Sequence, residues 1–397
     1  MIAFDTDRAA RLLHRLAFPR AVGSRGEALA ARLVGRAMAR AGRPVVRERF
    51  PVGTAARRFG VLPASIGAMA LVGMGLAALP GWPEIATACF LAAGYAVNAP
   101  WIVARSPAEP RRSRVWSENL VSWPVEDAGG PSPSRVVFLA HYDSKSQRLP
   151  TGARVALVVL ATSGCLVLAL IGAVEAAVPG LIGVVPAAGG AALVGVAVAA
   201  LMFNTSGNRS PGAIDNASGL AVMLELARSW RPRDGVPVEV AFVATGAEEV
   251  GLDGARAFLR RHEWWLRERP TLLINLESVG AGARVWLAGS NQAVAMAGRV
   301  ADLLGMPTGR LRVLGAGMDH EPFAAAGLDA VSLLGDVVAN SFAFHTPNDG
   351  VRLIDRDALV RAGSLASHLA RAWAGRHRLD PSGADEAGPL GVTPIGA

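Results

Sequence analysis

Four stretches of the 397-residue sequence contain no charged residue over about the length that a helix needs to cross a bilayer. They are residues 61–79, 85–104, 155–174 and 181–203. At a rise of 1.5 Å per residue, about 20 apolar residues span the hydrocarbon region. Buried helices of soluble proteins seldom extend that far without a charge, so the sequence predicts four membrane-spanning helices.

The four windows form two pairs, because the connectors at residues 80–84 and 175–180 are short. We therefore expect two transmembrane helical hairpins, at residues 59–105 and 151–205. Basic residues flank the outer ends of the windows, namely Arg57, Arg58, Arg105, Arg111, Arg112, Arg114, Lys145, Arg148, Arg154 and Arg209. The two hairpin tips carry only Glu84 and Glu175. The positive-inside rule then predicts a bacterial inner-membrane protein with its polar segments in the cytoplasm.

The composition agrees with a lipid bilayer as one partner. Charged residues make up 18% of the chain, against about 25% in soluble globular proteins. A mean hydropathy of +0.33 excludes an intrinsically disordered protein. The net charge is 40 − 32 = +8, yet no basic stretch interleaves with aromatic residues, so we expect no nucleic-acid partner. Cys89 and Cys165 both lie in apolar runs, which excludes a disulfide framework or a Cys-rich zinc site.

Outside the hairpins, the sequence alternates between helical and strand-like patterns. Helices are expected at 24–41, 219–230, 254–261 and 357–373, and an amphipathic helix within 1–18 that packs on the soluble body. Strands are expected at 45–50, 119–123, 135–140, 238–245, 271–276 and 330–334. This alternation predicts an α/β fold with a mostly parallel mixed sheet between helices. The soluble domain would comprise 1–58, 106–150 and 206–379, followed by a disordered tail at 380–397.

Polar residues follow the predicted buried strands at the point where each one ends. His141 and Asp143 follow the strand 135–140, Glu248 and Glu249 follow 238–245, and Glu277 follows 271–276. Asp215 opens the helix after the second hairpin, and His345 and Asp349 follow the last strand. Ligands of parallel sheets collect beyond the carboxyl ends of the strands, so we expect these side chains to meet at one edge.

Two histidines with several carboxylates, and no thiolate, suit zinc in a catalytic site, with manganese or cobalt as alternatives. A site of two metals needs one bridging carboxylate and further ligands on each ion, which leaves one carboxylate as a general base. Each cluster alone has a simpler interpretation: Asp143 and Asp349 suit turns, and Glu248 with Glu249 suits a helix N-terminus. Their coincidence at one sheet edge favours the metal site.

The strings HYDS, GAIDNASG, AEEVGLDGA, NLES, DHEPFAAAG and FHTPND, in this order, resemble the zinc aminopeptidase family that includes bacterial leucyl aminopeptidases, glutamate carboxypeptidase II and glutaminyl cyclases (peptidase family M28). The resemblance implies a zinc-exopeptidase-like fold, two Zn²⁺ ions per chain, and peptides or protein N-termini as substrates. Two features depart from the family pattern. Glu277 stands where the aminopeptidases more often have Asp, and the second hairpin separates His141 from Asp215 by 74 positions, which places the active site near the membrane.

The resemblance also assigns roles to individual residues. It implies that His141 and Glu277 hold one metal, that Glu249 and His345 hold the other, and that Asp215 bridges them. Glu248 would be the general base. The remaining implied roles are Asp143 as the group that orients His141, Asp319 and His320 as substrate-pocket residues, and a cis peptide bond between Asp215 and Asn216.

The leading hypothesis is a membrane-anchored, metal-dependent exopeptidase of the aminopeptidase type. A glutaminyl-cyclase-like acyltransferase is the first alternative, because HYDSK and MLELAR resemble that branch of the family. A catalytically inactive scaffold resembling nicalin is the second, and the intact ligand set argues against it. A transporter would need charged or histidine side chains inside the spans, and the four windows contain none.

Overall fold

The computed structural model describes residues 4–104, 115–124, 132–230, 238–311 and 317–377, so the predicted tail at 380–397 lies outside the described residues. The chain divides into two compact units. The first comprises Met1–Val52, Arg114–Ser146 and Asn208–Ala397, and the second comprises Gly53–Ser113 and Gln147–Gly207.

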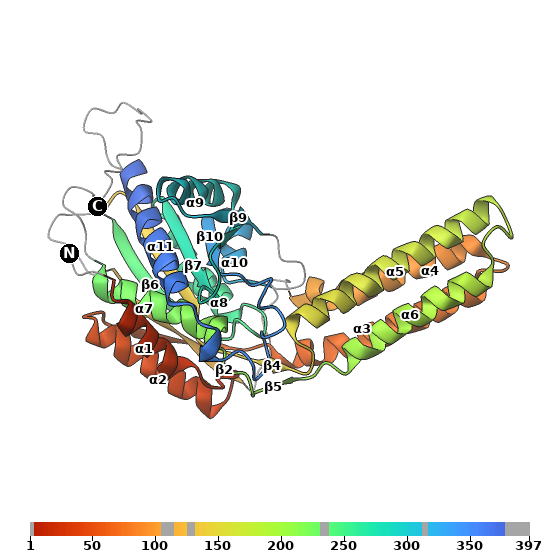
Figure 1. Ribbon diagram of the computed structural model, residues 1–397, viewed down its shortest axis with the longest axis horizontal. Coiled ribbons are helices and arrows are strands. Elements are labelled where there is room, and N and C mark those ends of the chain that lie inside the picture. Colours follow the sequence, from red (N-terminus) through yellow and green to blue (C-terminus); the bar gives the residue numbers. More distant parts are fainter. Residues whose placement is uncertain (1–3, 105–114, 125–131, 231–237, 312–316, 378–397) are drawn as a thin grey trace. The chain divides into compact units, whose positions relative to one another are not determined.

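The described part of the first unit is built on an eight-stranded sheet (Figure 1). Its spatial order is β1 (Val46–Pro51), β2 (Trp116–Ser122), β6 (Glu239–Thr245), β3 (Arg135–His141), β7 (Thr271–Glu277), β10 (Asp329–Leu334), β8 (Val285–Gly289) and β9 (Thr308–Arg310). The four central strands β6, β3, β7 and β10 run parallel to one another. β2 pairs antiparallel with β1 and β6, whereas β8 pairs antiparallel with β10 and parallel with β9. The predicted mostly parallel mixed sheet is thereby confirmed.

Helices cover both faces of this sheet. Alternate residues of β3 point to opposite faces, so Phe138 packs in one core and Leu139 in another. The first core also contains residues of α1 (Thr6–Leu16), α2 (Arg25–Arg40), α7 (Gly219–Ser229), α9 (Asn291–Leu303) and α11 (Arg356–Arg376). The second contains residues of α8 (Asp253–Arg267) and α10 (Glu321–Ala325). The expected amphipathic helix near the N-terminus is confirmed as α1, whose Ala9, Leu13 and Leu16 are buried.

The elements between residues 285 and 325 were not predicted. β8, β9 and α10 are short elements of five, three and five residues, so none of these three carries a long apolar period. β8 is positioned by pairing with β10, and β9 by pairing with β8, which the local sequence does not encode.

The described part of the second unit contains four helices, and each predicted apolar window lies largely within one of them. They are α3 (Thr54–Ala78), α4 (Pro83–Ala104), α5 (Thr151–Ala177) and α6 (Val184–Met202). α3 packs against α4 and α6, and α5 packs against the same two helices. Small residues permit this close packing: a Cβ on Gly172 would lie 2.5 Å from the Thr87 hydroxyl oxygen. By length and composition, α5 and α6 are apolar enough to cross a membrane. A separate two-stranded sheet is formed by β4 (Ser146–Gln147) and β5 (Ser206–Gly207).

The start of α2 contains a buried carboxylate whose pKa is shifted. The Ser24 hydroxyl accepts a hydrogen bond from the Glu27 amide, as the spacing of a capping box predicts. The Glu27 carboxylate accepts hydrogen bonds from the Gly23 amide and the Ser117 hydroxyl, each at 2.5 Å. Burial raises the pKa of Glu27 to about 7. The folded state therefore binds this proton more tightly than the unfolded state does.

Stability is expected to fall as pH rises from about 4.5 to above 7, since a raised pKa contributes stability that is lost as pH passes the folded-state value. The contribution of Glu27 is about 3 kcal/mol. A Glu27→Gln variant should show a flatter profile and a higher melting temperature at pH 8, because its amide donates to Ser117 and accepts from Gly23 without ionising. Thermal unfolding in detergent from pH 5 to 8 measures this, with exposed Glu263→Gln as the control. Parallel profiles for Glu27→Gln and the unmodified chain would contradict the prediction.

Candidate metal centre

The sheet brings the predicted site residues to one edge. His141 and Glu277 are the last residues of the parallel strands β3 and β7, and Glu248 and Glu249 lie just beyond the end of β6. Asp215 lies in the turn of helix Ala213–Ser218 that precedes α7, and His345 follows β10. The carboxyl ends of parallel strands meet at the same edge, which explains why residues more than 200 positions apart converge.

Two groups of ligand atoms form around Asp215. In the first, the His141 Nε2 atom lies 3.2 Å from both Asp215 Oδ1 and Glu277 Oε1. In the second, the His345 Nε2 atom lies 3.3 Å from Asp215 Oδ2 and 3.1 Å from Glu249 Oε2. Within each group, the ligand atoms all lie within 4.8 Å of one another. Asp215 belongs to both groups and directs one oxygen to each, which is the arrangement a bridging carboxylate requires.

The electrostatics of these groups favour bound cations. Burial opposes protonation of His141, yet Glu277 and Glu248 raise its pKa well above the usual value. Burial also raises the pKa of Glu277, while its attraction to His141 works in the opposite direction. Among the described residues, the Glu249 Oε1 atom has no hydrogen-bond partner and is buried. The carboxylates of Asp215, Glu248, Glu249 and Glu277 are each at most 11% exposed and outnumber the two imidazoles, and nitrogen and oxygen donors of this kind fit zinc.

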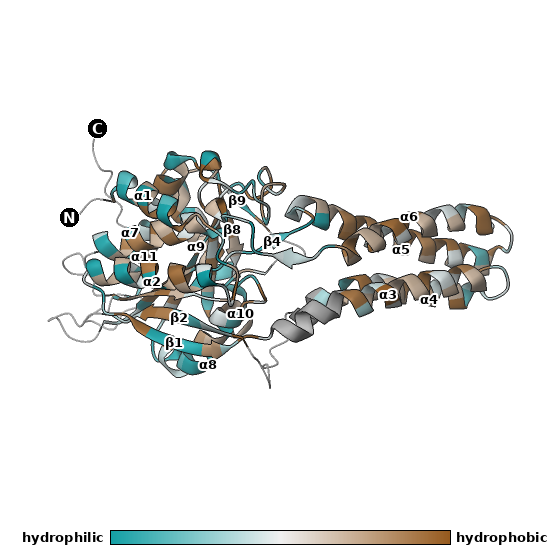
Figure 2. Cartoon of the chain, turned by 90° about the horizontal axis from the view of Figure 1, so that it is seen from below, coloured by the Kyte–Doolittle hydropathy of each residue, from teal (hydrophilic) through white to brown (hydrophobic). Residues whose placement is uncertain are grey.

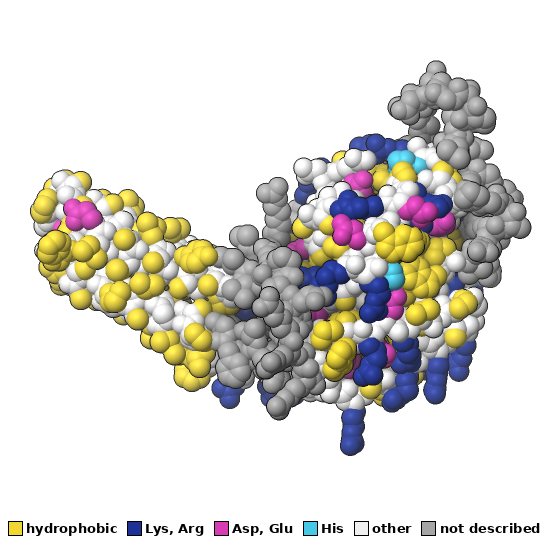
Figure 3. Space-filling view, turned by 180° about the vertical axis from the view of Figure 1, so that it is seen from behind, with side chains coloured by type: hydrophobic (Ala, Val, Ile, Leu, Met, Phe, Trp, Pro, Cys, Tyr) yellow, Lys and Arg dark blue, Asp and Glu magenta, His cyan; other side chains and the backbone are white. Residues whose placement is uncertain are grey.

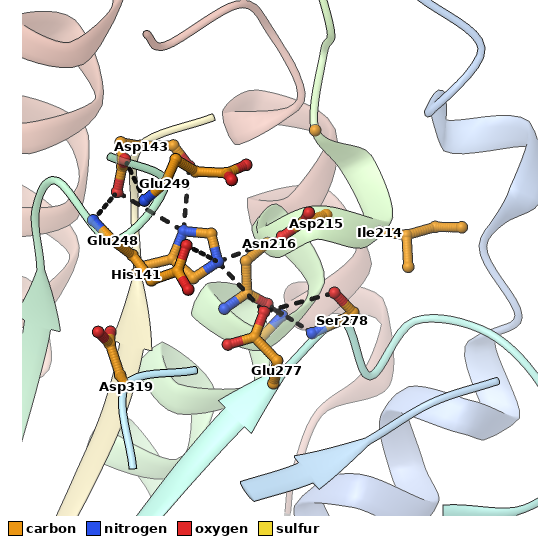
Figure 4. A network of polar contacts seen from close by, with 12 residues as sticks. His141, Asp143, Ile214, Asp215, Asn216, Glu248, Glu249, Glu277, Ser278 and Asp319 are labelled. Carbon is orange, nitrogen blue, oxygen red and sulfur yellow. Dashed lines mark hydrogen bonds and ion pairs between the residues drawn. The ribbon is translucent and has the colours of Figure 1, made fainter. Parts of the chain in front are cut away.

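Asp143 lies beside His141 and also contacts the loop that carries the two glutamates. Its two carboxylate oxygens accept hydrogen bonds from the backbone amides of Glu248 and Glu249, each at 3.1 Å (Figure 4). The His141 Nδ1 atom lies 3.2 Å from the Asp143 carbonyl oxygen and 3.6 Å from its carboxylate. The carbonyl oxygen and the carboxylate of Asp143 both face the His141 imidazole, and the carboxylate also holds the loop that carries the two glutamates. The role of Asp143 in orienting His141 stays a prediction.

Asp349 holds the main chain at Asp215, as Asp143 holds the main chain at Glu248 and Glu249. Its carboxylate accepts hydrogen bonds from the Ile214 amide at 2.7 Å and the Asp215 amide at 3.2 Å. Burial raises the pKa of Asp349 to about 7. The expected cis peptide bond between Asp215 and Asn216 is present. The string FHTPND contains Asp349, but the sequence alone was equally compatible with a simple turn residue at this position.

The two predicted pocket residues lie in different surroundings. Asp319 is buried, its Oδ2 atom pairs with the Thr245 hydroxyl, and burial raises its pKa to about 7. The His320 Nδ1 atom lies 2.7 Å from the Ser332 hydroxyl, and burial lowers its pKa to about 4. Neither residue belongs to the two ligand groups. Their contact with substrate remains a prediction.

Arg20 is a residue that sequence reasoning missed. Its guanidinium is fully buried and donates to the carbonyl oxygens of Tyr142 at 2.8 Å and Gly212 at 3.1 Å. Further acceptors are the carbonyl oxygens of Leu16, Phe18 and Pro211. Burial lowers the pKa of Arg20 to about 10, so it stays charged at neutral pH. Arg20 thus joins the two segments that carry His141 and Asp215.

An Arg20→Met variant is expected to lose about 3–5 kcal/mol of unfolding free energy, because several buried carbonyl oxygens lose their donor. Denaturant unfolding in detergent measures the loss. Arg36→Met, which removes an exposed arginine of α2, is the matched control and should change stability by less than about 0.5 kcal/mol. Equal effects of the two substitutions would show that the buried hydrogen bonds of Arg20 do not stabilise the site.

Comparisons with known proteins agree with this geometry. The model of peptidase family M28 matches residues 193–370. Aminopeptidase YwaD of Bacillus subtilis is 33% identical over 174 residues, which cover 40% of this chain and 37% of that protein. This chain therefore spans well under half of that relative's length.

Solved structures share the fold over most of the chain. The zinc aminopeptidase BSAP of Bacillus subtilis has a TM-score of 0.56 at 18% identity, covering 93% of this chain and 95% of that one. A glutaminyl cyclase of Fimbriiglobus ruber has a TM-score of 0.54 at 17% identity, with the same two coverages. Over residues 193–370 the chain is thus similar in sequence to peptidase family M28, and it shares its fold with a zinc aminopeptidase and a glutaminyl cyclase.

Proposed function

We propose that this protein is a metal-dependent exopeptidase that removes residues from the free N-terminus of peptides. The observation that carries the proposal is the pair of ligand groups sharing Asp215, with one further carboxylate beside them. Glu248 belongs to neither group, and its Oε2 atom lies 4.0 Å from the His141 Nε2 atom. A carboxylate next to a two-metal site but outside it is positioned to act as a general base.

The chain's own residues support each part of this proposal. Burial and the neighbouring Glu249 raise the pKa of Glu248 well above its usual value, so it readily accepts a proton. Glu248 would take a proton from the attacking water and return it to the leaving amine. Asp143 holds the Glu248 main chain and thereby fixes the base. His141, Asp215, Glu249, Glu277 and His345 would hold two zinc ions. When bound, such ions polarise the scissile carbonyl and lower the pKa of water.

The peptide substrate class is inferred from the aminopeptidase that matches this chain in sequence. A peptide panel tests it with detergent-purified protein and added zinc. The panel contains free-amine, N-acetylated, N-terminal-Gln and C-terminally blocked peptides. Cleavage confined to peptides with a free amine is the expected result. Release of ammonia from N-terminal Gln without cleavage would overturn the proposal in favour of a cyclase.

We further propose that α3, α4, α5 and α6 cross a bilayer and anchor the enzyme in the bacterial inner membrane. The helices of this unit are apolar along most of their length (Figure 2), and apolar side chains cover much of the face of this unit seen in Figure 3. Other apolar side chains of the unit pack in its own core. More than half of the surface of each of these side chains is exposed: Met74, Tyr95, Leu170, Val185 and Val196. In a soluble protein, the face of a helix that contacts water carries polar residues. The apolar exterior of these helices therefore supports contact with lipid.

Asn98 and Pro100, which interrupt the apolar pattern of α4, are compatible with a membrane-spanning helix. The Asn98 amide donates to the Gly94 carbonyl oxygen at 2.9 Å and to the Thr162 hydroxyl at 3.0 Å. Polar side chains that hydrogen-bond to a neighbouring helix are common among packed membrane helices. Pro100 lies near the end of α4, where an interruption disturbs few backbone hydrogen bonds.

Cysteine labelling on intact cells tests the anchoring and its orientation. In a chain with Cys89 and Cys165 replaced by Ala, Trp82→Cys places a thiol at a hairpin tip and Arg36→Cys places one on α2. A membrane-impermeant thiol reagent should label the Trp82→Cys chain on intact cells and the Arg36→Cys chain only after lysis. The reverse pattern would overturn the proposed orientation, and extraction without detergent would overturn the anchoring.

A further inference from the structure

Lys145 is the one lysine among the 40 basic residues of the chain. Its Nζ atom lies 2.8 Å from the Glu249 Oε2 atom and donates to the Glu249 carbonyl oxygen at 3.0 Å. The side chain is 18% exposed, so water screens this ion pair little. A compact ammonium reaches both oxygens of one residue, which a planar guanidinium does less readily. The lysine therefore binds directly to a residue of the second ligand group.

The oxygen that Lys145 contacts is the one that faces the site. Glu249 Oε2 lies 3.1 Å from the His345 Nε2 atom, so an ion held by Asp215, Glu249 and His345 would share this oxygen with the lysine. The ammonium would then lie in the second coordination shell of that ion. A neighbouring positive charge repels a cation, and it also makes the shared carboxylate a poorer donor.

The first ligand group has different neighbours. Among the described residues, Glu277 is contacted by the neutral Asn275 amide at 3.1 Å from its Oε2 atom, by the Ser278 hydroxyl and by His141. Asn275 in turn donates to the Ser332 hydroxyl at 2.9 Å, which fixes its orientation. Neutral donors orient a carboxylate without adding positive charge near the metal. The two groups thus share Asp215, but among the described residues a lysine ammonium contacts Glu249, whereas Glu277 is contacted by neutral donors and His141.

We propose that Lys145 makes the two metal positions unequal, so that the ion at His141, Asp215 and Glu277 binds tightly and the ion at Asp215, Glu249 and His345 binds more loosely. The inference rests on the proposed two-metal site. The second ion must compete with an ammonium for Glu249, whereas no lysine or arginine side chain in the described part of the chain pairs with Glu277. Occupancy of the second position would consequently follow the concentration of free metal, and the enzyme would become fully active only when zinc is abundant.

Zinc binding to the detergent-purified full chain tests the proposal without any measurement of turnover. Titration of the metal-free chain with zinc chloride against a chromophoric chelator should resolve two affinities that differ by at least about tenfold. Lys145→Met should tighten the weaker affinity by about tenfold or more, because the repelling charge is gone. Lys145→Arg retains the charge and should preserve the gap. Arg148→Met, which removes an exposed positive charge from the same segment, is the matched control and should change neither affinity.

A His345→Ala chain identifies the weaker position, since it should keep a single ion at the tighter affinity. Two equal affinities in the unmodified chain would overturn the proposal. Weaker zinc binding by a folded Lys145→Met chain, with an unchanged circular dichroism spectrum, would also overturn the proposal. It would show that Lys145 helps Glu249 to bind the metal. The outcome is separable from that of the peptide panel: unequal zinc binding without peptide cleavage would sustain this inference and reject the proposed substrate class.

Discussion

A Glu248→Gln variant is expected to keep both zinc ions and to lose about 10³-fold in kcat on free-amine peptides. Glutamine preserves the shape of the side chain but cannot accept a proton, and a general base contributes about 10²–10⁴-fold to rate. Glu248 belongs to neither ligand group, so its replacement leaves both groups intact. Steady-state kinetics, together with zinc content by mass spectrometry, measure both parts of the prediction.

The neighbouring residue offers the sharpest comparison. Glu249→Gln changes the same functional group one position along the chain, but it alters a member of the second ligand group. It should lose zinc from that position as well as activity. Exposed Glu263→Gln on α8 controls for the loss of one negative charge and should change neither. Retention of activity by Glu248→Gln would contradict the assignment of the base.

An Asp215→Asn variant is expected to lose both ions, because Asp215 is the one residue shared by the two groups. Its carboxylate is buried, and the two histidines lower its pKa against the effect of burial. An amide carries no charge and offers only one acceptor oxygen. We expect zinc affinity to fall by more than the about 10–100-fold typical of second-shell substitutions. Zinc content after dialysis against a zinc buffer measures the loss.

The fold of the Asp215→Asn chain should persist, since the contact with Asp349 uses the Asp215 backbone amide. Asp302→Asn, an exposed substitution on α9, is the control for general effects and should retain both ions. Two tightly bound ions in Asp215→Asn would show that Asp215 does not bridge the site.

The sequence predicted the central strands well, because each is a short apolar run that ends in polar residues. The strand expected at 135–140 is observed at Arg135–His141, and the one at 271–276 is observed at Thr271–Glu277. The last two strands of the sheet, β8 and β9, were not predicted, since they are short and are positioned by pairing with their neighbours. Apolar runs encode burial locally, whereas strand pairing at an edge depends on the rest of the sheet.

The sequence by itself determined which residue types stand at the ends of the parallel strands and where the long apolar helices lie. Both are properties of consecutive residues: a buried run, the polar residue that ends it, and a span without charge. Only the tertiary structure decided which partner each of these side chains contacts. It assigned the Asp143 carboxylate to the glutamate loop, brought Asp349 beneath Asp215, buried Arg20 between two distant segments, and set Lys145 against Glu249. These contacts join residues brought together by strand order and loop packing, so their hydrogen bonds and charges leave no periodic signal in the chain.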